Sequence, residues 1–215
     1  QAIKKFIFSL GVAKREAISD FDHLEHFLRE DLNLISYRVM AILNPIKLVI
    51  ENYPSDKVEF LEAENNPENS SFGKRKIPFS RELFIEKEDF MEDPSKNYFR
   101  LSIGKEVRLK HGYYVTCTNF VKNDDGKITE VRCSYDPLTK GGWSNDGRKV
   151  KGTIHWVSTK YAIKGEVRLY DKLFNKGNPM DHTDKNDFTS NINPNSIKII
   201  KNARLEPSLD NIDFN

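Results

Sequence analysis

The stretch YYVTCTNFVKNDDGKITEVRCSYD, residues 113–136, decides the fold of this 215-residue chain. Two runs rich in β-branched and aromatic residues flank the segment NDDGK, residues 123–127. Asp125-Gly126 within it is a hairpin signal, because glycine accepts the positive φ that a tight turn requires. The stretch therefore predicts two antiparallel strands joined by a turn.

Strand-like runs continue on both sides of this hairpin. Residues 37–54 are apolar and β-branched, and Asn44-Pro45 divides them into two expected strands. Residues 65–76, NNPENSSFGKRK, have the composition of a loop. Short strands at this close spacing favour small antiparallel barrels over a parallel sheet. Further strands are expected at the start of 81–90 and within 105–110, 148–158, 165–174 and 191–209.

The first 35 residues are expected to be helical instead. One apolar stripe at helical spacing ends at Gly11, and a second follows Ser19 or Asp20, either of which would cap its helix. The chain begins at Gln1 without an initiator methionine, which favours a fragment of a longer protein.

The charge of the chain is distributed unevenly along its length. The whole sequence has a net charge of only +2. Residues 96–168, however, contain 15 Lys and Arg against 7 Asp and Glu, a net of +8, whereas residues 38–95 contain 8 against 12. A segregated positive block is typical of a surface that binds a polyanion. The alternative is that it only neutralises the acidic segment beside it.

Motifs of membrane proteins, metal sites and enzymes are missing from the sequence. No run approaches the roughly 20 apolar residues that a membrane span requires. Cys117 and Cys133 form no CxxC motif, so reduced thiols and a cytoplasmic location are expected. His23 and His26 lie three apart without a third ligand nearby. Because phosphate-binding glycine loops, GxSxG and HExxH are also absent, we expect no catalytic and no metal-binding residue here.

The segment RKVKGTIHWVS, residues 148–158, has two different faces if it is extended. Lys149, Lys151, Thr153 and His155 share one face, and Trp156 lies on the other. The same alternation places Arg108 and Lys110 opposite Val107 and Leu109. These patterns predict a cationic outer face above an apolar core.

The segment NYFRL, residues 97–101, offers Tyr98 and Arg100 on one side of the chain. Unpaired nucleotides are recognised in this way, by stacking on a ring and by an arginine fork. Alternatively, Tyr98 is an ordinary core aromatic, and Arg100 and Arg108 form surface ion pairs with Glu106 or Glu130.

Seven stretches of the sequence carry a resemblance to a known family. They are LREDLN (28–33), RVMAILNPIKLVIENYP (38–54), GKRKIPFSRELFIEKEDF (73–90), YFRLSIGKEVRLK (98–110), DGRKVKGTIHWVS (146–158), EVRLYDKLF (166–174) and EPSL (206–209). With them the chain resembles the C-terminal, anticodon-binding region of class I glutaminyl-tRNA synthetases of bacterial type. Eukaryotic-type glutamyl-tRNA synthetases share the architecture, but KGTIHWVS and VIENYP favour glutamine. The same strands and charges also fit a ribosomal RNA-binding barrel protein or a protein-binding module.

The resemblance implies a mainly β fold with two small antiparallel β-barrels, of a type shared with a ribosomal protein, after a short helical segment. Residues 1–36 would end a helical connecting subdomain. Residues 37–95 and 163–215 would form a proximal barrel that is truncated at its C-terminal end. Residues 96–162, which coincide with most of the basic block, would form a distal barrel inserted into it.

The resemblance also implies which residues bind the anticodon loop of a tRNA. Arg38 falls where the family contacts the middle anticodon base, with the loop-contacting Asn33 just before it. Arg100 falls at the arginine for the third base, and Arg108 and Lys110 fall near the first. Lys110 stands where relatives can have arginine, which removes the bidentate fork.

At two further positions the match to the family's contact residues fails or weakens. Two lysines join the predicted tRNA-binding set because of their position in the sequence. Phe99 stands where a lysine contact is known, and Asn97 stands where a glutamine is known. Lys149 and Lys151 are expected beside phosphates, with Tyr98 completing the predicted tRNA-binding set.

The activity implied by the resemblance belongs to the whole parent enzyme. That enzyme would attach glutamine to glutamine tRNA with ATP and Mg²⁺, as a cytoplasmic monomer. The signature motifs of its catalytic domain do not occur in this sequence, so the chain alone is expected to be inactive and to hold no cofactor. Its expected partner is the anticodon loop, and neither DNA nor a membrane is expected.

Overall fold

The computed structural model describes residues 1–12, 14, 19–178, 180 and 187–211. The protein is mainly β with two N-terminal helices, as predicted. Its chain forms two compact units. The first consists of residues 1–38, 66–73 and 168–199, and the second consists of residues 39–65, 74–167 and 200–215.

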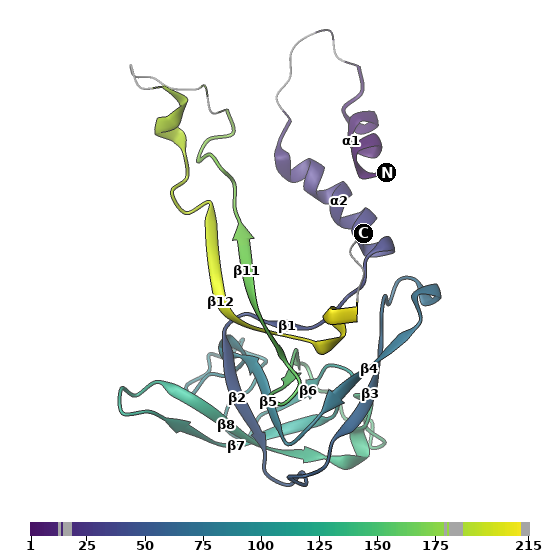
Figure 1. Ribbon diagram of the computed structural model, residues 1–215, viewed down its shortest axis with the longest axis vertical. Helices are drawn as coiled ribbons and strands as arrows, with labels where there is room; N and C mark the ends of the chain where they lie inside the picture. Colours follow the sequence, from purple (N-terminus) through teal and green to yellow (C-terminus); the bar gives the residue numbers. More distant parts are fainter. Residues whose placement is uncertain (13, 15–18, 179, 181–186, 212–215) are drawn as a thin grey trace. The chain divides into compact units, whose positions relative to one another are not determined.

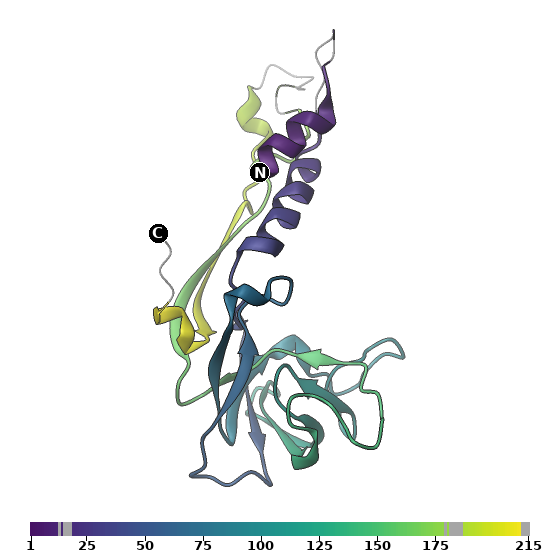
Figure 2. The same ribbon diagram turned by 90° about the vertical axis from the view of Figure 1, so that its right-hand side faces the viewer.

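The first unit contains helices α1 (Ala2–Leu10) and α2 (Phe21–Ile35), shown in Figures 1 and 2. The side chain of Asp20 caps α2 by accepting a hydrogen bond from the Asp22 N–H at 3.1 Å. Gly11 ends α1 with φ of 66°. Both ends confirm the prediction, because a short carboxylate satisfies a free N–H group and glycine tolerates positive φ.

The second unit is built around a seven-stranded sheet with the strand order β10-β5-β2-β8-β7-β6-β9. Figure 1 labels β2, β5, β6, β7 and β8 of this sheet. Its strands are β2 (Pro45–Ile50), β5 (Glu82–Glu86), β6 (Glu106–Leu109), β7 (Tyr114–Lys122), β8 (Ile128–Asp136), β9 (Thr153–Ile154) and β10 (Val157–Ser158).

Strands β7 and β8 form the predicted hairpin. Cys117 lies directly opposite Cys133, and Gly126 has the positive φ, 74°, that the turn requires. Two other pairings are parallel, namely β2 with β8 and β6 with β9. The expectation of purely antiparallel barrels is wrong there, because each of these pairs joins strands that are separated by a long connection rather than by a hairpin.

The remaining strands form two smaller sheets. Strand β3 (Glu59–Glu64) pairs antiparallel with β4 (Lys74–Phe79), and β12 (Ile197–Leu205) lies between β1 (Ala41–Ile42) and β11 (Ile163–Tyr170). The short 3-10 helices are Ser70–Phe72, Lys87–Asp89, Pro137–Thr139, Phe188–Asn191 and Pro207–Asn211.

The loop predicted for residues 65–76 is wrong at its end, because Lys74 to Lys76 belong to β4. Arg75 is satisfied there by distant groups. It forms an ion pair with the buried Glu206 and donates a hydrogen bond to the Glu64 carbonyl oxygen at 2.8 Å. Composition alone cannot reveal such partners.

A hydrophobic core joins buried residues of the seven-stranded sheet to buried residues of β1, β3 and β4. Trp156 is only 1% exposed, packs edge-to-face on Phe79, and donates its indole N–H to the Lys110 carbonyl oxygen at 2.8 Å. A buried indole with a satisfied N–H is stable in a core. The division into proximal and distal barrels with boundaries near residues 36, 95 and 162 stays a prediction.

Candidate nucleic-acid interface

A hollow of about 510 Å³ lies where residues 94–100 approach residues 105–106 and 149–152. Five of its lining side chains are cationic and only Glu106 is acidic. Glu106 is neutralised by Arg148, whose Nε lies 3.0 Å from the carboxylate. We call this site the cationic hollow; its cations are Lys96, Arg100, Lys105, Lys149 and Lys151.

The segment 149–156 alternates as predicted. Lys149, Lys151, Thr153 and His155 are exposed, whereas Gly152, Ile154 and Trp156 are buried. The two lysines therefore point outward while the buried positions hold the segment on the core.

Gly152 lets this segment approach its neighbours closely. A Cβ atom there would lie 2.1 Å from the Phe99 carbonyl oxygen, so no other residue fits without a shift. On its other side, the Gly152 carbonyl accepts a hydrogen bond from the Arg108 N–H at 2.9 Å. Residues 99, 152 and 108 thus lie side by side.

Arg100 is held by a carboxylate that the sequence did not single out. Its Nη1 forms an ion pair with Asp89, which is 2% exposed, while the Arg100 side chain is 52% exposed. Burial raises the pKa of Asp89, and the positive charge of Arg100 opposes that rise. One side of the arginine fork is thereby fixed, and no other partner of its guanidinium occurs among the described residues.

Tyr98 and Phe99 differ in what they expose. The Tyr98 hydroxyl donates to the Glu88 carbonyl oxygen at 3.1 Å, and burial raises the pKa of Tyr98 to about 12. Phe99 is 50% exposed, and the Lys151 ammonium lies 4.7 Å from the centre of its ring. The more accessible ring of the hollow is therefore Phe99, although it was not among the predicted tRNA-binding residues.

Arg108 lies on β6, Lys110 follows directly after that strand, and neither lines the cationic hollow. Both are half-buried and alternate with the fully buried Val107 and Leu109, as predicted. The ion pairs considered for Arg100 and Arg108 do not form in the described structure, because Glu106 pairs with Arg148 and Glu130 pairs with Lys47 and Arg132.

Asn33 and Arg38 belong to the first unit, whereas the other six predicted tRNA-binding residues belong to the second. Arg38 Nη2 donates to Asn33 Oδ1 at 3.0 Å and lies 4.0 Å from Glu68. The buried amide of Asn66 donates to the carbonyl oxygens of Asn33 and Ser36, both at 3.0 Å. The structure thus brings this pair together at the end of α2.

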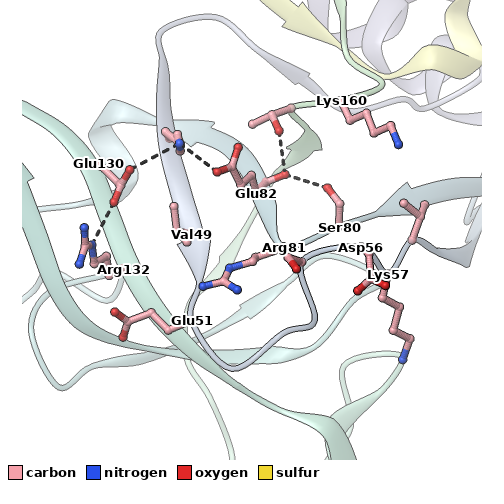
Figure 3. A pocket seen from close by; sticks show the side chains of 14 residues that line it. Val49, Glu51, Asp56, Lys57, Ser80, Arg81, Glu82, Glu130, Arg132 and Lys160 are labelled. Carbon is pink, nitrogen blue, oxygen red and sulfur yellow. Dashed lines mark hydrogen bonds and ion pairs between the residues drawn. The ribbon is translucent and has the colours of Figure 1, made fainter.

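A second hollow of similar size has a different charge pattern (Figure 3). It has a volume of about 540 Å³, and we call it the mixed-charge pocket. Lys47 Nζ lies 3.1 Å from Glu82 and 3.6 Å from Glu130, and Arg132 Nε lies 3.0 Å from Glu130. Its charged residues are Lys47, Lys57, Arg81, Arg132 and Lys160 against Glu51, Asp56, Glu82 and Glu130.

Among the described residues, no group of three or more His, Cys, Asp or Glu side chains is placed to hold a metal ion. No helix within those residues is long and apolar enough to cross a membrane.

Known proteins similar to this chain agree with one another. Residues 36–136 and residues 153–214 each match a family described as tRNA synthetases class I (E and Q), anti-codon binding domain. The glutamine–tRNA ligase of Bradyrhizobium diazoefficiens is 48% identical over 208 residues, which cover 97% of this chain and 37% of the relative. The ligase of Clostridium kluyveri is 47% identical over 212 residues, covering 99% and 38%.

A third relative gives the same result. The glutamine–tRNA ligase of Clostridium perfringens is 50% identical over 211 residues, covering 97% of this chain and 37% of the relative. The chain therefore spans well under half the length of the curated relatives that it matches. By its sequence and by the span of both matches, it belongs to the anticodon-binding domains of the class I tRNA synthetases for glutamate and glutamine.

Proposed function

We propose that the chain is the anticodon-binding region of a glutamine–tRNA ligase and binds the anticodon loop of glutamine tRNA. The observation that carries this proposal is the cationic hollow, in which five exposed cations lie beside an exposed phenylalanine ring. Single-stranded RNA requires both features, because phosphates need positive charge and unstacked bases need a planar surface.

The lysines and the arginine of the hollow have different tasks in this proposal. Lys149 and Lys151 are exposed point charges on flexible stems, which suit phosphates of any sequence. Arg100 offers a planar fork whose orientation is fixed by Asp89, which suits the edge of one base. The lysines therefore supply affinity, and Arg100 supplies discrimination.

In this proposal, Asn33 and Arg38 form a second pair of residues that recognises an anticodon base. The Asn33 side chain holds one nitrogen of the Arg38 fork, as Asp89 does for Arg100. We assign Arg38 to the middle base and Arg100 to the third base, with Arg108 and Lys110 near the first. The proximal and distal barrels predicted from the sequence would present these groups to one loop.

The ligase reaction is proposed for the whole protein. It would use ATP and Mg²⁺ in the part of the ligase that lies outside the matched region, and the chain alone would bind tRNA without charging it. The names of the relatives support glutamine over the eukaryotic-type glutamyl alternative. The two matches to anticodon-binding domains support a synthetase over a ribosomal barrel protein.

The test is equilibrium binding of two tRNAs to the chain at several salt concentrations. One tRNA carries the glutamine anticodon, and the other has a changed middle base. We expect tighter binding of the first, and weaker binding of both as salt rises, because phosphate contacts release counterions. Equal affinity for both tRNAs at every salt concentration would contradict the proposal.

A further inference from the structure

Among the described residues of the second unit, the most exposed aromatic ring lies outside the cationic hollow. Trp143 is 77% exposed and follows Gly141 and Gly142, both of which have positive φ. The Arg108 guanidinium carbon lies 5.9 Å from the centre of its ring. One face of the indole is therefore backed by a cation, and much of the ring remains open to solvent.

Arg108 is held close to this loop, and one of its hydrogen-bond donors has no partner among the described residues. A Cβ atom on Gly142 would lie 2.6 Å from Arg108 Cδ, so the loop backbone rests on the arginine stem. Arg108 Nε is buried and has no hydrogen-bond partner within the described residues. Buried donors in native proteins normally have a partner, so this nitrogen is an exception.

The surroundings of Trp143 favour nucleic acid over a protein partner. The nearby Arg148 is neutralised by Glu106, Asp136 and Asp146, so Arg108 is the cation beside the ring that is left to attract an anion. A single planar ring on a cation is suited to stacking with one base.

The segment 149–153 lies beside both cation–ring contacts. Its Gly152 lies beside Phe99 and accepts a hydrogen bond from the Arg108 N–H. Lys151 of this segment lies over the Phe99 ring, and Arg108 lies over the Trp143 ring.

We propose that Trp143 and Arg108 form a second stacking platform, which binds one unpaired base of the RNA strand held in the cationic hollow. This inference rests on the proposed function, because it requires single-stranded RNA to lie across residues 149–153. Lys149 and Lys151 bind the phosphates between the two platforms, and the Arg108 guanidinium supports the indole ring.

The test compares the tRNA affinity of Trp143→Ala and Trp143→Phe with that of Leu138→Ala. Leu138 is the matched control, because it lies in the same connection between β8 and β9 and is 73% exposed. Trp143→Ala should weaken binding by about fivefold to 150-fold, the usual effect of removing one stacked base contact. Trp143→Phe should retain most of the affinity, and Leu138→Ala should change it less than about twofold.

Fluorescence separates stacking from a merely structural role. The chain contains two tryptophans, of which Trp156 is buried and Trp143 is exposed. Adding tRNA should quench the emission of Trp143 in the wild-type chain and leave the emission of Trp143→Phe, which comes from Trp156, unchanged. An unaltered Trp156 spectrum in Trp143→Ala shows that the core remains folded.

The outcomes distinguish this inference from the proposed function. If Lys149→Ala and Lys151→Ala weaken tRNA binding but Trp143→Ala does not, the platform is wrong and the proposed function stands. If Leu138→Ala weakens binding as much as Trp143→Ala, the loop acts as a whole and the platform is also wrong. If the wild-type chain binds no tRNA, both the platform and the proposed function are wrong.

Discussion

The cationic hollow and the mixed-charge pocket have nearly the same volume, about 510 and 540 Å³, and each is lined by five cations. They differ in their acids, because the cationic hollow has one acidic lining residue and the mixed-charge pocket has four. In the mixed-charge pocket Lys47 and Arg132 are already paired with Glu82 and Glu130. The number of cations is therefore a poor guide to a polyanion site; the excess of cations over acids in the lining is a better one.

The free energy that a charge pair contributes to folding depends on its burial. The largest effect that we expect tests this dependence at a charge pair outside both hollows. Glu206 and Arg75 form a pair that is 2% and 11% exposed, with Arg75 Nη2 2.9 Å from the carboxylate. Glu206→Gln should lower the free energy of unfolding by about 3–5 kcal/mol, because it leaves a buried charge unpaired. Urea denaturation measures this effect, and an unchanged midpoint would contradict the dependence on burial.

The same pair predicts a pH dependence. Burial opposes ionisation of Glu206, but hydrogen bonds from Arg75, the Met40 N–H and the Ser208 hydroxyl outweigh it and hold the pKa of this carboxyl below its usual range. The stability that Glu206 contributes is therefore present above the unfolded-state pKa of about 4.3 and is lost as the pH falls through the lower folded-state pKa. Urea midpoints between pH 7 and pH 3 should fall more steeply for the wild type than for Glu206→Gln.

The next largest effect concerns discrimination between bases. Arg100→Ala should cost about 1–3 kcal/mol of binding to the tRNA with the glutamine anticodon, and it should relax selection at the third base only. Asp89→Asn should have a smaller effect in the same direction, because it frees the fork without removing it. Affinities for tRNAs changed at each anticodon base measure both. If Arg100→Ala weakened all of these tRNAs equally, Arg100 would be a phosphate contact instead.

The lysines should act on salt dependence instead. Lys149→Ala or Lys151→Ala should reduce the slope of log affinity against log salt by about 1 each, and each change should weaken all tRNAs alike. The control is Arg81→Ala in the mixed-charge pocket, which also removes one positive charge. An equal loss of slope in Arg81→Ala would show that net charge, not the hollow, governs binding.

The smallest effect is expected where charges are exposed and paired. Lys47→Ala should change the free energy of unfolding by about 0.2–1 kcal/mol, because Lys47, Glu82 and Glu130 are all partly open to solvent. It should leave tRNA affinity unchanged. Thermal unfolding and one binding titration check both expectations. A loss of several kcal/mol in the free energy of unfolding would contradict the first, because it would show that this pocket stabilises the fold.

Local patterns predicted much of the fold. The cap at Asp20, the hairpin turn at Gly126 and the outward direction of Lys149 and Lys151 depend on neighbouring residues, so the sequence reveals them. The parallel pairing of β2 with β8 depends on partners far along the chain, and the strand at residues 74–76 depends on pairing with β3; neither was predicted.

The candidate site likewise contains residues that local sequence patterns predict and residues that only the structure reveals. Arg100 could be found from its pattern, whereas Asp89 could not, because it lies in a segment that is acidic throughout and only its burial distinguishes it. Phe99 and Trp143 follow no motif. A search for aromatic residues near the basic block could have suggested them, but only the structure shows that they are exposed and backed by cations.

The central claim, that the cations of the hollow with few acids bind the anticodon loop, is tested most directly by a matched pair of double variants. Lys149→Ala with Lys151→Ala removes two positive charges from the cationic hollow, and Lys57→Ala with Lys160→Ala removes two from the mixed-charge pocket. We expect the first variant to bind the tRNA with the glutamine anticodon at least about tenfold more weakly than the wild type at low salt, and the second to bind it like the wild type. Equal losses in the two variants would contradict the claim.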